Sequence, residues 1–183
     1  MTTATALLVI DMQQEMAART LAGRDRANPD AEGHIASLIA LFRARGLPVI
    51  HVHHDEPGTP VALDQPGGAV MDCARPLPGE TVFVKSASSA FSGTGLDAWL
   101  RRHGIGRIVL VGAVAAFCVT TTTRVASDLG LQVILPGDAL VGFDIPAHDG
   151  GRISAATVLR VTLSLLGADF ARLVTTADVA DLL

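Results

Sequence analysis

The sequence predicts an α/β fold, a single three-layer α/β/α Rossmann-like domain over residues 1–183 with a parallel sheet of five to six strands. Two observations predict it. Short apolar runs rich in Val, Ile and Leu recur along the chain, and helix-like segments separate them. Near-continuous apolar runs are typical of strands buried on both faces of a parallel sheet. Strand and helix in alternation then predict right-handed crossovers within one domain.

Each apolar run is an expected strand. The runs cover residues 6–10, 47–52, 81–84, 107–111, 131–135 and 172–175. Helices are expected between them, and each is followed by a glycine, which accommodates the left-handed conformation that ends many helices. The expected helices cover residues 31–45, 96–103, 119–129 and 153–166, followed by Gly46, Gly104, Gly130 and Gly167.

One connection is unusually long. Residues 55–80 contain five prolines and four glycines and predict a loop. Loops beyond roughly 12 to 15 residues are uncommon in compact domains and often act as lids or binding segments. A lid, a subunit contact and a disordered surface insertion all fit this composition.

The composition excludes several classes of protein. With 49% hydrophobic and 17% charged residues, the chain is not intrinsically disordered. A net charge of −4 with scattered arginines offers no basic surface for nucleic acid. No apolar run approaches the roughly 18 residues of a membrane span, and the N-terminus lacks the pattern of a signal peptide. We therefore expect a cytoplasmic protein whose two cysteines, Cys73 and Cys118, are free thiols.

Polar residues with catalytic potential follow three of the expected strands. Asp11 follows the first strand, Lys85 follows the third, and Cys118 lies beyond the fourth, where a helix is expected to begin. The carboxyl ends of parallel strands meet at one edge, where ligands bind in open α/β sheets. Lys85 is also the only lysine among 14 basic residues, which favours a site that needs a compact ammonium.

These three residue types suit nucleophilic catalysis. A helix N-terminus and a nearby ammonium lower the pKa of a thiol, and an adjacent carboxylate takes its proton. Taken singly, each has a simpler interpretation: Cys118 as a small buried residue, Asp11 as a helix N-cap, and Lys85 as a solvated side chain. Their convergence on one edge of the sheet favours a catalytic site.

The motifs around these residues resemble those of the isochorismatase-like cysteine hydrolases, a family that includes nicotinamidases and N-carbamoylsarcosine amidohydrolase. The resemblance covers nearly the whole chain. It is carried by three segments, A-L-L-V-I-D-M-Q at 6–13, K-S-A-S-S-A-F-S-G-T-G-L at 85–96, and V-G-A-V-A-A-F-C-V at 111–119. The pattern of Arg124 to Gly130 is also similar to the family's.

The resemblance implies a triad in which Cys118 is the nucleophile, Asp11 the general base and Lys85 their electrostatic partner. It also implies a cis peptide bond between Ala113 and Val114. The backbone N–H groups of Val114 and Cys118 would then form an oxyanion hole, an arrangement that stabilises the tetrahedral intermediate of acyl transfer.

The substrate pocket is expected to depart from the family's pattern. Ala115 and Ala116 stand where Thr and then Asn or Asp are frequent, so we expect a less polar wall beside the nucleophile. Met16 stands where Phe is common in the family, and its side chain is more flexible and of similar length. The residues expected to line the pocket are Gln13, Met16, Phe91 and Phe117.

No metal and no other cofactor are expected. Nicotinamidases hold a metal with an Asp-x-His motif and a second His, and that spacing is missing here. His51, His53, His54 and Asp55 are the nearest candidate ligands, and strand geometry puts His51 and His53 on one face. A site needs a further well-placed ligand, so these histidines are interpreted as polar residues of a strand end.

The sequence thus predicts a cysteine-dependent hydrolase that cleaves a C–N bond of a small amide or carbamoyl compound through a covalent thioester. Two alternatives stay open: vinyl-ether hydrolysis of the isochorismatase type, and a catalytically silent binding or scaffold homologue. The expected partners are a small-molecule substrate and, by resemblance, further copies of the chain in a homo-oligomer, a dimer or larger. Neither nucleic acid nor a membrane is an expected partner.

Overall fold

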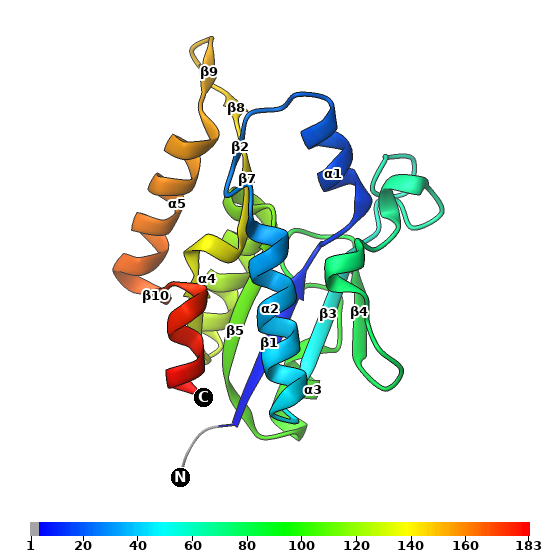
Figure 1. Cartoon of the computed structure of the whole chain (residues 1–183), viewed down its shortest axis with the longest axis vertical. Helices are drawn as coiled ribbons and strands as arrows, with labels where there is room; N and C mark the ends of the chain where they lie inside the picture. Colours follow the sequence, from blue (N-terminus) through cyan, green and yellow to red (C-terminus); the bar gives the residue numbers. More distant parts are fainter. Residues whose placement is uncertain (1–3) are drawn as a thin grey trace.

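The structure is a computed structural model that describes residues 4–183, so residues 1–3 of the expected domain lie outside it. A parallel sheet forms its centre, with the strand order β10-β6-β5-β1-β3-β4 (Figure 1). Every expected strand is found. The strands are β1 (Ala4–Ile10), β3 (Val49–His54), β4 (Thr81–Lys85), β5 (Ile105–Ala113), β6 (Gln132–Pro136) and β10 (Arg172–Val174).

Two short strands that the sequence analysis missed enlarge this sheet to eight strands. β7 (Leu140–Phe143) pairs in parallel with the end of β5, and β2 (Arg26–Ala27) pairs antiparallel with β7. β5 is nine residues long, and β6 pairs only with its first half. The free edge beside Gly112 and Ala113 is therefore filled by β7. A separate hairpin joins β8 (Ile145–Pro146) and β9 (Arg152–Ile153).

Helices cover both faces of the sheet. α2 (Ala31–Ala44) packs on one face, and α3 (Leu96–Arg102), α4 (Thr120–Asp128) and α5 (Ala155–Asp169) pack on the other (Figure 1). The three-layer architecture is therefore confirmed. α1 (Gln14–Leu21) was not expected, and it contacts the 55–80 loop. Single turns of 3-10 helix lie at Pro66–Gly68, Asp72–Ala74 and Gly137–Ala139, and a longer one at Thr176–Leu182.

Three of the expected glycine caps are found, and the fourth is wrong. Gly46, Gly104 and Gly130 have φ values of 64°, 65° and 84° directly after their helices. Gly167, in contrast, lies inside α5, which continues beyond it. A Cβ at this position would lie 2.6 Å from Leu173 Cδ1, so the glycine lets β10 pack against the helix. The glycine therefore marks a close approach of two elements.

The strand order reverses next to β1. The chain passes from β1 outward to β3 and β4, then crosses back to β5 on the opposite side of β1. β1 and β5 approach closely there: Gly112 has φ 120°, and a Cβ on it would lie 2.1 Å from the carbonyl oxygen of Ile10. Ligands bind at such switch points. Within residues 4–183, no helix combines the length and apolar character needed to cross a bilayer.

Candidate active site

The ammonium of Lys85 lies at the centre of a buried polar cluster at this switch point. Its Nζ donates to Oδ2 of Asp11 at 2.8 Å and to Sγ of Cys118 at 3.3 Å. It lies 2.8 Å from Nδ1 of His54. The Lys85 side chain has no exposed surface. An ammonium has three protons, so these three contacts account for all of them.

Asp11 follows β1 in the left-handed conformation, with φ 50°. The N-cap of α1 is Gln13, so the interpretation of Asp11 as a helix cap is wrong. Burial raises the pKa of the Asp11 carboxyl, although the charge of Lys85 opposes this shift. Oδ2 is bonded to Lys85, whereas Oδ1 is buried with no hydrogen-bond partner in the part of the chain that the structure describes. A free, desolvated oxygen is a good acceptor for a proton.

Cys118 lies in a π-helical turn, Ala115–Val119, between β5 and α4. The expectation that a helix N-terminus lowers the pKa of this thiol is wrong. Burial raises the pKa of Cys118 to about 11, and the charge of Asp11 adds to the shift while Lys85 opposes it. The resting form at neutral pH is therefore the thiol. Such a thiol needs a base when it attacks a carbonyl carbon, and Asp11 is the adjacent base.

His54 is the residue that sequence reasoning missed. It ends β3 in register with Lys85 of β4, and neighbouring residues in register on parallel strands share a face of the sheet. His51 and His53 point to the opposite face, where His51 Nε2 lies 2.9 Å from Glu80 Oε2. The three histidines therefore do not gather at one site. The register between β3 and β4 places His54 beside the ammonium, and the period within each strand does not give that register.

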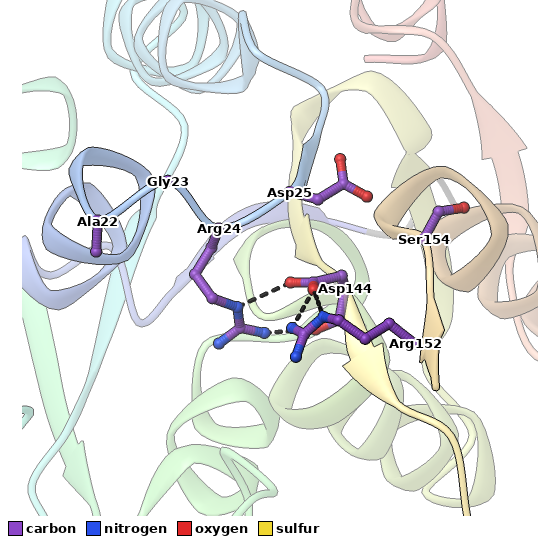
Figure 2. Close-up of a pocket in the computed structure, with 7 residues that line it drawn as sticks. All are labelled: Ala22, Gly23, Arg24, Asp25, Asp144, Arg152 and Ser154. Carbon is purple, nitrogen blue, oxygen red and sulfur yellow. Dashed lines mark hydrogen bonds and ion pairs between the residues drawn. The ribbon is translucent and has the colours of Figure 1, made fainter. Parts of the chain in front are cut away.

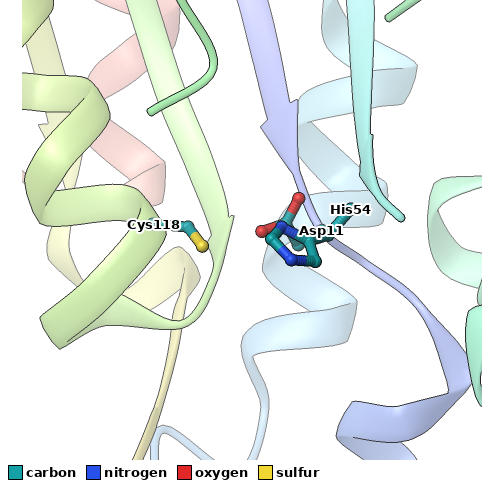
Figure 3. A group of neighbouring side chains, drawn as sticks. All are labelled: Asp11, His54 and Cys118. Atoms are coloured by element: carbon teal, nitrogen blue, oxygen red, sulfur yellow. The ribbon is translucent and has the colours of Figure 1, made fainter. Parts of the chain in front are cut away.

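Asp11, His54 and Cys118 have their ligand-type atoms within 4.8 Å of one another (Figure 3). Figure 3 shows the Cys118 thiol facing the other two side chains across the site. Each of the three groups also makes a contact of 3.3 Å or less with the ammonium of Lys85. The positive charge that these three groups contact is therefore the ammonium of Lys85.

A small cavity of about 220 Å³ opens beside Cys118. Met16 and Phe117 line it, as expected, together with Val114, which was expected as an oxyanion donor, and with four residues that were not predicted: Arg19, His54, Glu56 and Val61. Gln13 and Phe91 do not line it. Gln13 is fully buried, and Phe91 packs against the core on the α3 side of the sheet. The apolar part of the wall comes from Met16, Val61, Val114 and Phe117. Ala115 and Ala116, expected to form it, do not line the cavity, and Ala115 is buried in the core.

The 55–80 loop forms part of this cavity through Glu56 and Val61. The Gln13 side chain donates to the carbonyl oxygens of Val61 at 3.3 Å and Gly68 at 3.0 Å. A Cβ at Gly68 would lie 2.0 Å from the Ala62 carbonyl oxygen, so the loop is folded closely on itself. The loop is packed against the domain, so its interpretation as a disordered insertion is wrong, and its role as a lid or a subunit contact stays a prediction.

The backbone before Cys118 has the cis peptide bond, between Ala113 and Val114, that the family resemblance implied. The N–H groups of Phe117 and Val119 both donate to the carbonyl of Val114, at 2.9 and 3.4 Å. The N–H groups of Val114 and Cys118 lie at this turn, on the residue after the cis bond and on the nucleophile itself. Their role as an oxyanion hole stays a prediction.

A larger hollow of about 510 Å³ lies between the end of α1 and the β8–β9 hairpin (Figure 2). Its charges compensate one another: Asp144 accepts from Arg24 Nε at 2.8 Å and pairs with Arg152. These contacts attach the hairpin to the segment before β2. The hydroxyl that lines the hollow, Ser154 Oγ, caps α5 by accepting from the Thr157 N–H at 3.3 Å. Neither cysteine nor histidine is among the lining residues, so the site beside Cys118 is the one suited to covalent chemistry.

The fold and this site define a class of protein, three-layer α/β/α proteins with an Asp, Lys and Cys cluster at the carboxyl edge of a parallel sheet. The family model of the isochorismatase domain matches residues 5–164, and the chain belongs to this family of cysteine hydrolases. An uncharacterized isochorismatase family protein, YrdC of Bacillus subtilis, is 30% identical over 93% of this chain and 91% of its own.

Solved structures agree. An isochorismatase-family protein from Chromobacterium violaceum is 38% identical, with a TM-score of 0.92 over 98% of this chain and 93% of its own. A cysteine hydrolase from Pseudomonas syringae is 28% identical, with a TM-score of 0.89 over 98% and 92%. Relatives with a named activity include a streptothricin hydrolase of Streptomyces noursei, 34% identical over 78% of this chain and 51% of its own. A ureidoacrylate amidohydrolase of Methylorubrum extorquens is 30% identical over 66% and 63%.

Proposed function

We propose that the protein hydrolyses a C–N bond of a small amide or carbamoyl compound through a covalent thioester on Cys118. The observation that carries the proposal is the cluster itself. A carboxylate and a thiol are both hydrogen bonded to one buried ammonium, and all but the ammonium line an open cavity. A nucleophile beside a base that a third group orients is the arrangement needed for covalent catalysis.

In the proposed first half-reaction, Oδ1 of Asp11 takes the thiol proton as Cys118 Sγ bonds to the substrate carbonyl carbon. The N–H groups of Val114 and Cys118 donate to the resulting oxyanion. Asp11 then gives the proton to the departing nitrogen, and the C–N bond breaks to leave the thioester. The raised pKa of the Asp11 carboxyl supports this role, because the group holds a proton more readily than a solvated aspartate.

In the second half-reaction, Asp11 takes a proton from water while the water oxygen attacks the thioester carbon. The acid is released, and the proton returns to Cys118. Throughout, Lys85 stabilises whichever of Asp11 and Cys118 carries the negative charge, because its ammonium contacts both.

The cavity favours a small and largely apolar substrate. Its volume of about 220 Å³ is below the roughly 300–1,000 Å³ of typical sites for drug-sized ligands. The side chains of Met16, Val61, Val114 and Phe117 would contact the apolar part, with Arg19 and Glu56 as the charged groups of the wall. The named amidohydrolase among the relatives supports an amide-type bond as the target.

A panel of small primary amides and carbamoyl compounds tests the proposal. We expect ammonia release from at least one member, and a hydroxamate product when hydroxylamine is added, because hydroxylamine intercepts a thioester. Release of ammonia with no hydroxamate at any hydroxylamine concentration would contradict the covalent route. Turnover of a vinyl ether and of no amide would establish the alternative chemistry, and turnover of neither class would indicate a silent homologue.

A further inference from the structure

His54 makes a contact with the ammonium that the proposed mechanism does not use. We propose that His54 is a positioning residue, a neutral imidazole that accepts the third proton of Lys85 and thereby aims the other two at Asp11 and Cys118. This inference rests on the proposed function of those three residues. Its basis is the 2.8 Å separation of Lys85 Nζ and His54 Nδ1 inside the site.

The partner of Nδ1 fixes the state of the ring. An ammonium has no lone pair to accept a hydrogen bond, so Nδ1 of His54 accepts and carries no proton. A neutral imidazole with a free Nδ1 carries its proton on Nε2. That nitrogen lies 3.5 Å from Oε2 of Glu56, whose negative charge favours a proton on Nε2. The Lys85 contact therefore selects both the charge and the tautomer of the ring.

The backbone of His54 is held as firmly as its ring. Gln13 is fully buried, and its side-chain amide binds both sides of residue 54. Oε1 accepts from the His54 N–H at 2.8 Å, and Nε2 donates to the His54 carbonyl at 2.9 Å. The His54 side chain is 15% exposed at the cavity wall. A position held by this many directed contacts is built to keep the ring in one place.

Charged or titratable groups from four segments face this ring. They are Asp11 after β1, Lys85 of β4, Cys118 of the π turn, and Glu56 of the loop that follows β3. Without an acceptor at the Nδ1 position, one proton of a fully buried ammonium has no partner. The ammonium would then turn toward water in the cavity, and it would stabilise a thiolate on Cys118 less well.

The alkylation of Cys118 measures this effect without a substrate. The probe is iodoacetamide, applied across a range of pH to protein that carries Cys73→Ser, with the labelled peptide identified by mass spectrometry. Three variants separate the two ring nitrogens. His54→Asn places an acceptor near the Nδ1 position, His54→Gln places polar atoms near the Nε2 position, and His54→Phe provides neither.

We expect His54→Phe and His54→Gln to slow alkylation of Cys118 at neutral pH by about tenfold or more, the scale of losing one hydrogen bond to a charged group. Their pH profiles should move to higher pH, and His54→Asn should restore most of the rate and the profile. The matched control is His53→Phe, the same substitution on the opposite face of β3, which should leave alkylation unchanged. Thermal unfolding of each variant verifies that it is folded.

Equal alkylation profiles for the parent, His54→Phe and His54→Asn would overturn the inference. A parent-like alkylation rate in His54→Gln, together with a slowed rate in His54→Asn, would also overturn it, because that result assigns the role to Nε2. These outcomes concern the thiol alone. They are therefore distinct from a failure of the amide and hydroxylamine experiment, which would remove the proposed hydrolysis and leave the effect of His54 on Cys118 intact.

Discussion

Lys85 is the only lysine of the chain, and it is among the most buried charged residues that the structure describes, at 2% exposed. An isolated buried charge is costly, so an ammonium in this position requires partners that offset its desolvation. Asp11 supplies the opposite charge, and His54 and Cys118 supply the remaining acceptors. The residue that was conspicuous in the composition is also the one that links the strand ends of the site.

Replacing Lys85 by Arg keeps the charge and tests the geometry. A guanidinium is longer and planar, and it cannot direct three protons at three converging acceptors from one atom. We expect Lys85→Arg to fold and to lower kcat by about 100-fold, comparable with losing a preorganised charge interaction in other active sites. Steady-state kinetics on an amide that the panel identifies, with circular dichroism for folding, provide the measurement. Near-normal kcat in the folded variant would show that charge alone suffices.

Much of the site at this scale could be predicted from the sequence. A rule about strand ends brought Asp11, Lys85 and Cys118 together, because parallel strands deliver their last residues to one edge. The pKa of Cys118 could not be predicted. It depends on how deeply neighbouring segments bury the sulfur, and that is a property of the packed molecule. His54 was missed because three histidines in four residues were considered together, first as metal ligands and then as polar residues of a strand end.

At the scale of elements, regular segments were predictable and short ones were not. The strands and long helices have apolar patterns extensive enough to identify them, whereas β2, β7 and α1 depend on what they pack against. β7 pairs with the end of β5, where β5 extends beyond its pairing with β6. No local sequence pattern predicts this difference in strand length. The contact of Gln13 with residues 54, 61 and 68 is likewise a long-range effect.

The close approach of β1 and β5 gives a prediction at this scale. In Gly112→Ala the new Cβ would meet the Ile10 carbonyl oxygen at 2.1 Å and hold a strained φ of 120°. Because Asp11 directly follows Ile10, the strand cannot move aside without disturbing the site. We expect the free energy of unfolding to fall by roughly 2–4 kcal/mol, measured by urea denaturation.

The matched control is Gly33→Ala in α2, where a Cβ meets nothing within 4 Å. Alanine is favoured over glycine inside helices, so this variant should gain about 0.5–1 kcal/mol. Two identical substitutions would then shift stability in opposite directions. A Gly112→Ala variant as stable as the parent would contradict the close approach of the two strands.

At the scale of the whole molecule, His53 should make stability depend on pH. Burial, followed by the charge of His51, lowers the pKa of His53 to about 4 from 6.5. His53 therefore binds a proton below about pH 6.5 in the unfolded chain, but only near pH 4 in the folded chain. The free energy of unfolding should fall as the pH drops across this window. Because the ring is partly exposed, the loss attributable to His53 is on the order of 1–2 kcal/mol.

Urea denaturation at pH 7, 5.5 and 4.5 measures this loss. A His53→Phe variant should lose less stability over the range than the parent, since the titrating ring is gone. Parallel curves for the two proteins would show that His53 titrates normally. The sedimentation profile of the same samples tests the expected homo-oligomer, which stays a prediction, as does the cytoplasmic location.

Turnover by Cys118→Ala tests the proposed covalent mechanism most directly. The comparison is Cys73→Ala, which removes the other half-buried thiol, on the far side of the sheet from α3. With an amide identified in the panel, Cys118→Ala should show no turnover above background and form no hydroxamate with hydroxylamine, while Cys73→Ala retains the parent rate. Turnover by a folded Cys118→Ala variant at the rate of the parent would contradict covalent hydrolysis at this site.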